Sequence, residues 1–467
     1  MRRANGTSVR GGRWEAVIDA PPQTDVNVSQ ARPGPRETIG LYHAIALCVG
    51  VVIGAGIFRV PSIVAAASPN GAVFLCAWLA GGLLSIAGAL CYAELASAFP
   101  SAGGDYSFLR RAYGRPVAFL YGWARLTVIQ TGSLAILAYI FGDYLAALWP
   151  LGPYSSPLYA GVLIGFLTLL NWLGLRTGAG TQLWLTVLEV AGICAVIVAG
   201  FLVAPQAPVP SPGAQTDAVG LVLVFVLLAY GGWSEVVYVS AELRQARRRI
   251  AKVLIVSLAI VTLLYLLLNL SLLRAFGLQG IAQSEAVAFA LMDRWLGPAG
   301  GAIISLIVAI AAVTSANATA ITGARSAYAL GEDFPRLGWL GQWNGERGTP
   351  ANALLLQGLL ALVIIAVSAL DRHSFQSAVE YTAPVFWFFL LLVGIALFVL
   401  RWREPDRERP FRVPFYPILP GLFCATSGFL LVSSLIYTGP AALMGVAVLV
   451  VGATLLPFVA KGEGVGD

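Results

Sequence analysis

Glycine interrupts two of the most apolar segments of the chain, at Gly54-Ala55-Gly56 and within Ala229-Tyr230-Gly231-Gly232-Trp233. Glycine allows the backbone to leave a helix, so that N–H and C=O groups near it become available for binding. Freed N–H groups at the positive end of a helix attract an anionic group, and freed carbonyls attract a cationic one. Two such breaks predict a site that binds a small charged molecule through main-chain atoms.

Ionisable residues inside other apolar segments are costly there, and we treat them as gating or coupling candidates. They are Arg125, Glu189 and Glu235. A rise of about 1.5 Å per residue places Arg125 and Glu189 at similar depth, so the two are expected to be able to pair. Such a pair would have either a role in coupling or a structural role alone. Glu235 is expected to face either the ligand or a neighbouring helix.

The segment Thr314-Ser315-Ala316-Asn317 adds hydroxyl and amide groups within an apolar run. Ser315 and Asn317 are gating or coupling candidates, and the family resemblance described below implies an ion ligand at this position. The alternative is that such hydroxyls bond to the carbonyls of their own helix, as hydroxyls in membrane helices commonly do.

Composition indicates that these residues are positioned by membrane helices. The chain is 58% hydrophobic and 11% charged, with a mean hydropathy of +0.80, far more apolar than a soluble domain. Windows of about 17 to 25 apolar residues predict about twelve spans. They cover residues 39–67, 71–99, 116–148, 159–172, 181–203, 219–241, 253–276, 300–330, 351–368, 375–399, 415–437 and 441–459.

The distribution of charge predicts the orientation of these spans. With the N-terminus inside, the cytoplasmic loops carry most of the arginines and lysines, in agreement with the positive-inside rule. This bias explains the formal net charge of +6, so no nucleic-acid partner is predicted. The five cysteines lie in apolar runs and the two histidines have no ligand cluster near them. We therefore predict no disulfide, metal site or cofactor.

Several segments resemble the amino acid-polyamine-organocation (APC) superfamily, and in particular its L-type amino acid permease branch. Residues 52–58 are similar to the glycine-rich break in the first span of that family, and residues 229–233 to the break in its sixth span. Residues 92–106 and 405–414 match further family motifs, at the exits of the second and tenth spans. The similarities follow in a consistent order from about residue 37 to the C-terminus.

The resemblance implies an all-α integral membrane fold of about twelve helices. Two five-helix inverted repeats of the LeuT type would be followed by two C-terminal helices, with helices 1 and 6 discontinuous. The implied organisation is a disordered cytoplasmic tail (residues 1–37), a transport core (residues 38–400), and a cytoplasmic loop with the last two helices and a short tail (residues 401–467).

The resemblance and the polarity of half-helices together imply how a zwitterion would bind. The amides of Ala55, Gly56 and Ile57 would bind a carboxylate. The carbonyls that would bind an ammonium group are those of Val52, Ile53, Leu228, Ala229 and Tyr230. The alternative, that these glycines only allow close helix packing, is disfavoured by the two breaks in register. The predicted substrate-binding residues are Val52, Ile53, Gly54, Ala55, Gly56, Ile57, Leu228, Ala229, Tyr230 and Gly231.

Two positions depart from the pattern of the family. Many relatives have an aromatic lid where this chain has Leu228. Occlusion is then expected either to be looser or to be supplied by Phe225 or Trp233, and the alternative for Trp233 is a packing role. Relatives commonly carry a lysine, similar to a built-in substitute for sodium, where this chain has Glu189. We predict that Glu189 is a protonation site, or the partner of Arg125, that biases the inward- and outward-facing states.

The function implied by the resemblance is that of a secondary active transporter in the cytoplasmic membrane, with both termini cytoplasmic. It would move neutral L-amino acids by exchange or proton symport. The alternatives are a carrier of cationic amino acids or polyamines, recognised by Glu235, and a sensor that binds without transport. No enzyme is predicted, because no nucleophile–base constellation is evident. Eukaryotic relatives join an ancillary subunit through a cysteine, and residues 149–156 contain none, so no disulfide-linked subunit is expected.

Overall fold

The structure is a computed structural model, and it describes residues 41–100, 104–174, 179–206, 219–235, 246–344, 349–370, 374–437 and 440–460. These residues belong to one unit of the chain, Glu37–Asp467. The predicted N-terminal tail lies outside the described residues, so its disorder stays a prediction.

The described part of the chain is helical and contains no β-strand. Within the described ranges, ten helices are long and apolar enough to cross a membrane, and shorter apolar helices occupy the first and sixth predicted spans. The predicted all-α integral membrane fold is confirmed, while the count of about twelve spans stays a prediction. The α-helices are α1 (Leu41–Ile53), α2 (Val60–Ala67), α3 (Gly71–Ala98), α4 (Gly104–Tyr113), α5 (Arg115–Ala124), α6 (Gln130–Leu148), α7 (Ser155–Trp172), α8 (Ala179–Leu202), α9 (Val219–Ala229), α11 (Ala246–Ala282), α12 (Val287–Leu296), α13 (Pro298–Asp333), α14 (Ala351–Ser368), α15 (Ser374–Arg403), α16 (Ile418–Tyr437) and α17 (Pro440–Ala460).

Local sequence explains where several of these helices begin. The side chain of Asn70 caps α3 by accepting a hydrogen bond from the Val73 N–H at 2.9 Å, which satisfies one of the donors left free at a helix start. A proline lies in the first turn of α2, where the missing N–H costs nothing. α5 and α6 are joined by a wider π-helical stretch, Arg125–Ile129. Such π-helical stretches are frequent at functional sites.

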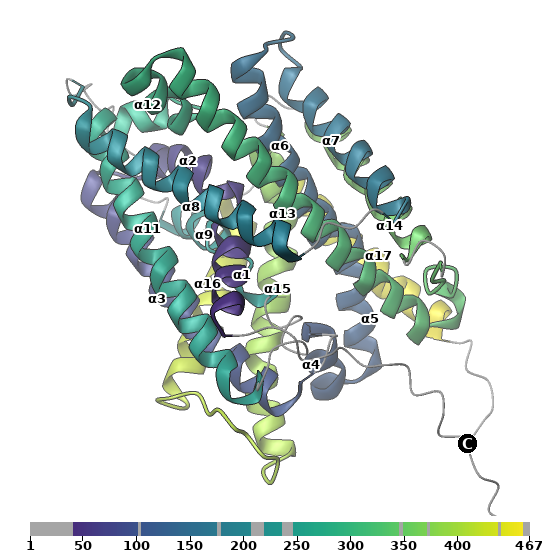
Figure 1. Ribbon diagram of the computed structural model, residues 1–467. Helices are drawn as coiled ribbons and strands as arrows, with labels where there is room; N and C mark the ends of the chain where they lie inside the picture. The colour runs from purple at the N-terminus through teal and green to yellow at the C-terminus, as the bar shows by residue number, and fades with distance from the viewer. Residues whose placement is uncertain are drawn as a thin grey trace, which may run out of the picture. The chain divides into compact units, whose positions relative to one another are not determined.

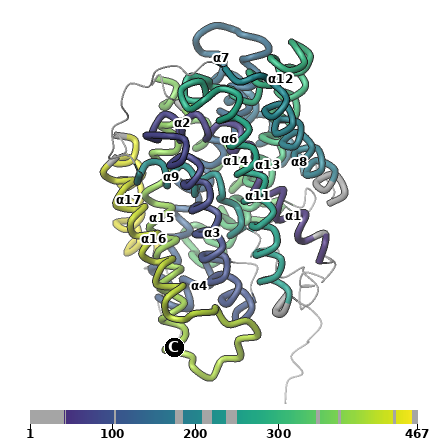
Figure 2. Tube along the Cα trace, turned by 90° about the vertical axis from the view of Figure 1, so that its left-hand side faces the viewer, coloured from purple at the N-terminus to yellow at the C-terminus, as the bar shows by residue number. Residues whose placement is uncertain are grey.

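The long helices surround the first predicted span. α1 contacts α8 and α11, and α13 contacts α6 and α8. Figure 1 shows α11 along α3, and α7 along α14. Figure 2 shows α3, α15 and α16 as neighbours. The short helices α4 and α12 lie at opposite ends of the long helices in both views. Residues on α8, α11 and α13 can therefore act on the glycine-rich segment after α1.

Candidate functional site

The first break, residues 54–59, separates α1 from α2. Gly54 has a φ of 31° and a ψ of 172°, which takes the backbone out of the helix. One 3₁₀ turn, Ala55–Phe58, follows. The N–H groups of Ala55 and Gly56 come first in this turn, where a 3₁₀ helix offers them no carbonyl partner. The break thus presents two main-chain donors suited to an anionic group.

The second break, residues 230–235, follows α9. The backbone at Gly232 has a φ of 96°, a conformation that residues with a side chain rarely adopt. A short 3₁₀ turn, Trp233–Glu235, comes next. The remainder of the sixth predicted span begins at residue 236, and residues 236–245 lie outside the described residues.

Each break lies against the helix that precedes the other break. A Cβ on Gly232 would lie 2.7 Å from the carbonyl oxygen of Val51, a distance that real Cβ atoms essentially never show. A Cβ on Gly56 would lie 4.0 Å from the Cα of Ala229. Glycine at position 232 is therefore what allows the second break to lie against the end of α1.

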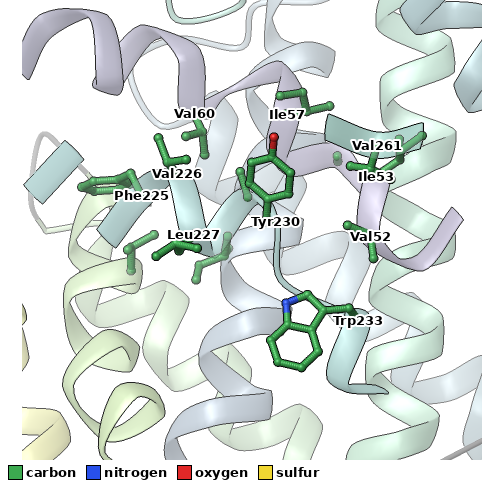
Figure 3. Close-up of a cluster of buried hydrophobic side chains, with 14 of the residues drawn as sticks. Val52, Ile53, Ile57, Val60, Phe225, Val226, Leu227, Tyr230, Trp233 and Val261 are labelled. Atoms are coloured by element: carbon green, nitrogen blue, oxygen red, sulfur yellow. The ribbon is translucent and has the colours of Figure 1, made fainter. Parts of the chain in front are cut away.

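Apolar side chains from both breaks form one buried cluster. Figure 3 shows Val52 and Ile53 of α1 and Ile57 of the first break, together with Tyr230 and Trp233 of the second break. Burial among apolar groups strengthens hydrogen bonds and electrostatic interactions because the local dielectric is low. The main-chain groups of the breaks therefore lie in surroundings that strengthen their interaction with a charged ligand.

The hydroxyl of Tyr265 on α11 joins the two breaks. It lies in donor position 3.1 Å from the carbonyl oxygens of both Val52 and Ile53, and 3.2 Å from that of Ala229. Its ring is fully buried and packs edge-on against Trp78, with 5.7 Å between ring centroids. Three of the carbonyls that we assigned to an ammonium group thus converge on one point. The sequence analysis did not identify Tyr265, because a tyrosine in an apolar span resembles any other buried aromatic residue.

Two other residues of the predicted binding set have partners within the protein. The carbonyl of Leu228 accepts a hydrogen bond from the N–H of Gly231 at 2.9 Å. The hydroxyl of Tyr230 donates to the carbonyl of Trp78 on α3, also at 2.9 Å. The bond from Tyr230 holds the second break against α3, and the bond from Gly231 holds it to the end of α9. Among the predicted carbonyls, those of Val52, Ile53 and Ala229 form the convergent group.

The prediction that Arg125 pairs with Glu189 is wrong. Nη2 of Arg125 lies 2.9 Å from both carboxylate oxygens of Glu235 in the second break. The same guanidinium donates to Ser326 on α13 at 3.0 Å and to Tyr121 at 2.9 Å. Counting residues along a helix gives the depth of a side chain but not its direction around the axis. The π-helical stretch places Arg125 toward α13 and the second break instead of α8.

Asp105 of α4 extends this polar network. Its Oδ2 accepts a hydrogen bond of 3.0 Å from the hydroxyl of Tyr121, which in turn accepts from Arg125. Burial raises the pKa of the Asp105 carboxyl to about 6, although the nearby Arg125 guanidinium opposes the shift. The network links α4, α5, α13 and the second break, and the sequence analysis had not included Asp105 in it.

Glu189 of α8 is in a different environment. It is 1% exposed, its Oε1 lies 3.1 Å from the Oγ1 of Thr314 on α13, and its Oε2 has no hydrogen-bond partner. Among the described residues no arginine or lysine forms an ion pair with it. The carboxyl therefore lies beside the hydroxyl-bearing segment of α13, with no positive charge to balance it.

The two ion-binding candidates of α13 have separate neighbours. A Cβ on Gly54 would lie 3.6 Å from the Oγ of Ser315, so Ser315 borders the first break. The side-chain oxygen of Asn317 accepts a hydrogen bond of 2.7 Å from Asn171 on α7. Asn317 thus connects two helices, whereas Ser315 remains a candidate for contact with a ligand.

A cavity borders the second break on the side of α3, α15 and α16. It is small and partly open to its surroundings, and Gly231, Gly232 and Trp233 line it. Two further lining residues, Ser85 and Trp387, have buried polar atoms without a hydrogen-bond partner. Trp233 packs edge-on against Tyr92, with 5.0 Å between centroids, which supports a packing role. Its gating role stays a prediction.

Comparison with known proteins gives consistent similarities. A family model described as amino acid permease matches residues 39–456. The human b(0,+)-type amino acid transporter 1 is 32% identical over 412 residues, which cover 86% of this chain and 83% of the relative. The serine/threonine exchanger SteT of Bacillus subtilis (strain 168) is 29% identical over 408 residues, or 86% of this chain and 92% of SteT. The human large neutral amino acids transporter small subunit 2 is 29% identical over 436 residues, or 89% of this chain and 79% of the relative.

Proposed function

The chain belongs to the amino acid permease family of the APC superfamily, with relatives in its L-type branch, and from this premise we propose that it transports neutral L-amino acids across the cytoplasmic membrane. The relatives compared above are an amino acid transporter, a serine/threonine exchanger and a large neutral amino acids transporter subunit. Transport would proceed by alternating access, with both termini cytoplasmic and without a disulfide-linked subunit.

One observation carries the proposal: carbonyls from both breaks converge on the Tyr265 hydroxyl. A cluster of carbonyl oxygens attracts an ammonium group, while the N–H groups of Ala55 and Gly56 suit a carboxylate at the start of a helical turn. Every α-amino acid carries an amino group and a carboxylate on the same carbon atom. The breaks therefore recognise the common part of the substrate through the main chain, and no charged side chain is required for it.

The charges near the breaks favour neutral over cationic substrates. Glu235, the acidic residue available to recognise a basic side chain, is bound by Arg125 through both oxygens. Removing this partner would leave a guanidinium that is 3% exposed without its counter-ion, which is strongly unfavourable. The cavity beside the second break is lined mainly by apolar and aromatic residues, including Phe386 and Trp387. We assign this cavity to the side chain of a neutral substrate.

Counterflow in proteoliposomes tests the proposal. Purified protein is reconstituted with internal unlabelled L-serine, and uptake of labelled L-serine is measured against competition by each of the twenty amino acids and by putrescine. We expect neutral L-amino acids to compete at least tenfold better than L-arginine or putrescine. Preferential competition by the basic compounds would support the cationic carrier, and binding without flux would support the sensor.

A matched pair of glycine variants tests the main-chain site. Gly232→Ala places a Cβ against the Val51 carbonyl, while Gly421→Ala on α16 places one where nothing lies within 4 Å. We expect Gly232→Ala to reduce counterflow at least tenfold and Gly421→Ala to leave it unchanged. Equal activity of the two variants would remove the contact between the second break and α1 from the mechanism.

A further inference from the structure

Glu189 is a buried carboxyl group whose charge nothing in its described surroundings balances. It lies on α8 and is 1% exposed, and its nearest polar contact is the neutral hydroxyl of Thr314. A buried carboxylate without a counter-ion or several hydrogen-bond donors is unfavourable and tends to take up a proton. The surroundings therefore favour the neutral acid in this arrangement of the helices.

The hydrogen bonds of Thr314 support the same assignment. Its Oγ1 lies 2.9 Å from the Ala311 carbonyl of its own helix and 3.1 Å from Oε1 of Glu189. The hydroxyl lies in donor position to both oxygens, but its single proton can serve only one of them at a time. If the carboxyl is protonated, it can donate to Thr314 while the hydroxyl donates to Ala311. A protonated Glu189 satisfies both contacts, whereas a carboxylate and Ala311 would compete for one hydrogen.

Among the side chains that the structure describes, no other titratable or charged group near α8 forms an ion pair with Glu189. Tyr265 interacts with Glu189 electrostatically. On α11 the charged residues lie at least nine positions from Tyr265, and on α13 they lie at least nine positions from Thr314. Nine positions correspond to about 13 Å along a helix. Arg294 of α12 binds the carbonyl of Ala204, beyond the far end of α8. The titratable or charged residues on helices packed against α8 are Tyr42, His43 and Cys48 of α1; Arg247, Arg248, Arg249, Lys252, Tyr265 and Arg274 of α11; Asp293 and Arg294 of α12; and Arg325, Tyr328, Glu332 and Asp333 of α13. The side chains of His43, Arg247 and Arg248 lie outside the described part of the structure.

Glu189 is also placed to respond to movement of the first break. One turn before it on α8, Thr186 meets α1 so closely that a Cβ on Gly50 would lie 2.1 Å from the Thr186 Oγ1. Ser315, next to Thr314, borders Gly54 on the other side. In this arrangement the carboxyl is 1% exposed, and a movement of α1 away from α8 would open it to water and to proton exchange.

Resting on the proposed function, we propose that Glu189 is the proton-binding site through which amino acid uptake is coupled to a proton gradient. In the outward-facing state its carboxylate takes a proton from external water, forming the O–H bond. The neutral acid permits α1 to close against α8 with substrate bound. In the inward-facing state the O–H bond breaks and the proton passes to internal water. One proton thus moves in the same direction as each amino acid.

Proton movement in proteoliposomes tests the site without relying on a variant alone. Wild-type protein is reconstituted with a pH-sensitive dye inside, and labelled L-serine uptake is measured with the interior alkaline. We expect accumulation that depends on the pH gradient, together with internal acidification on addition of L-serine. Uptake without acidification would overturn the proposal, as would accumulation driven by a sodium gradient at equal pH.

Variants assign the effect to Glu189. We expect Glu189→Gln to retain counterflow within about threefold of the wild type, because an amide can replace the neutral acid. Accumulation driven by the pH gradient should fall at least tenfold. Glu380→Gln, a change of a buried carboxyl on α15, is the matched control and should retain both activities. Unchanged pH-driven accumulation in Glu189→Gln would overturn the assignment. Absence of counterflow in the wild type would instead reject the proposed function itself.

Discussion

Two carboxyl groups inside the helical part of the molecule, Glu235 and Glu189, are held in opposite ways. Glu235 is 28% exposed in its side chain, and both of its oxygens contact the Arg125 guanidinium. Glu189 is almost completely buried and meets only a threonine hydroxyl among its described contacts. A balanced charge resists change, whereas an unbalanced buried carboxyl changes its charge when its surroundings change. The first arrangement suits a fixed contact and the second a group that titrates during a cycle.

The largest expected effect is a difference in protein stability between variants of the two carboxyl groups. Glu235→Gln leaves Arg125 buried without its counter-ion, and breaking such a pair costs about 3–5 kcal/mol. We expect the lower end of this range, because Tyr121 and Ser326 still bind the guanidinium. Glu189→Gln replaces a neutral acid by a neutral amide and should change stability little. Thermal unfolding of purified protein in detergent measures both, and an equal loss in the two variants would remove the distinction.

A third carboxyl group, that of Asp105, extends the comparison to the pH dependence of stability. The pKa of Asp105 is raised to about 6 by burial, so the folded state binds this proton more tightly than the unfolded state does. The stabilisation is complete below about pH 4 and is lost as pH rises through 6, by at most about 3 kcal/mol. Asp105→Asn should therefore lose this part of the pH dependence between pH 4 and 7. Unfolding temperatures across that range test it, and an unaltered slope in the variant would contradict it.

The interaction between Arg125 and Glu235 is expected to have a smaller, separable effect. Arg125→Gln combined with Glu235→Gln removes both charges, so no buried charge is left without a partner. We expect the double variant to be more stable than Glu235→Gln alone, with an interaction energy of about 1–3 kcal/mol in a double-mutant cycle. Additive losses of unfolding free energy in the two single variants would show that the two side chains do not depend on each other.

The smallest expected effect concerns the Tyr265 hydroxyl, which lies against three carbonyls beside the breaks. Tyr265→Phe removes one hydrogen bond, worth about 0.5–1.5 kcal/mol, which corresponds to roughly a two- to tenfold loss of L-serine counterflow. Tyr139→Phe removes a similar buried hydroxyl that bonds to the Ile365 carbonyl on α14, far from the breaks. It should lower stability by a comparable amount without affecting counterflow. Equal transport by the two variants would argue against a role for Tyr265 at the site.

The sequence was informative about features that depend on local residue type. Glycines at 54 and 232 marked places where the backbone has a positive φ, and apolar runs predicted the membrane helices. Contacts between helices could not be predicted in this way. The partner of Arg125 depends on rotation about the axis at a π-helical stretch, and the contact of Glu189 with Thr314 depends on how α8 and α13 pack. Tyr265 was missed because its importance comes from three carbonyls on two other segments.

The cluster around Tyr265 has a simple donor stoichiometry. A phenolic hydroxyl carries one hydrogen, so at any instant it can serve only one of the carbonyls of Val52, Ile53 and Ala229 well. The other two retain lone pairs directed at the same small volume. A primary ammonium carries three N–H donors, enough for both carbonyls that the hydroxyl leaves free. The number of hydrogens, in addition to the sign of the charge, therefore distinguishes an unblocked amino terminus from its N,N-dimethylated or acylated derivatives.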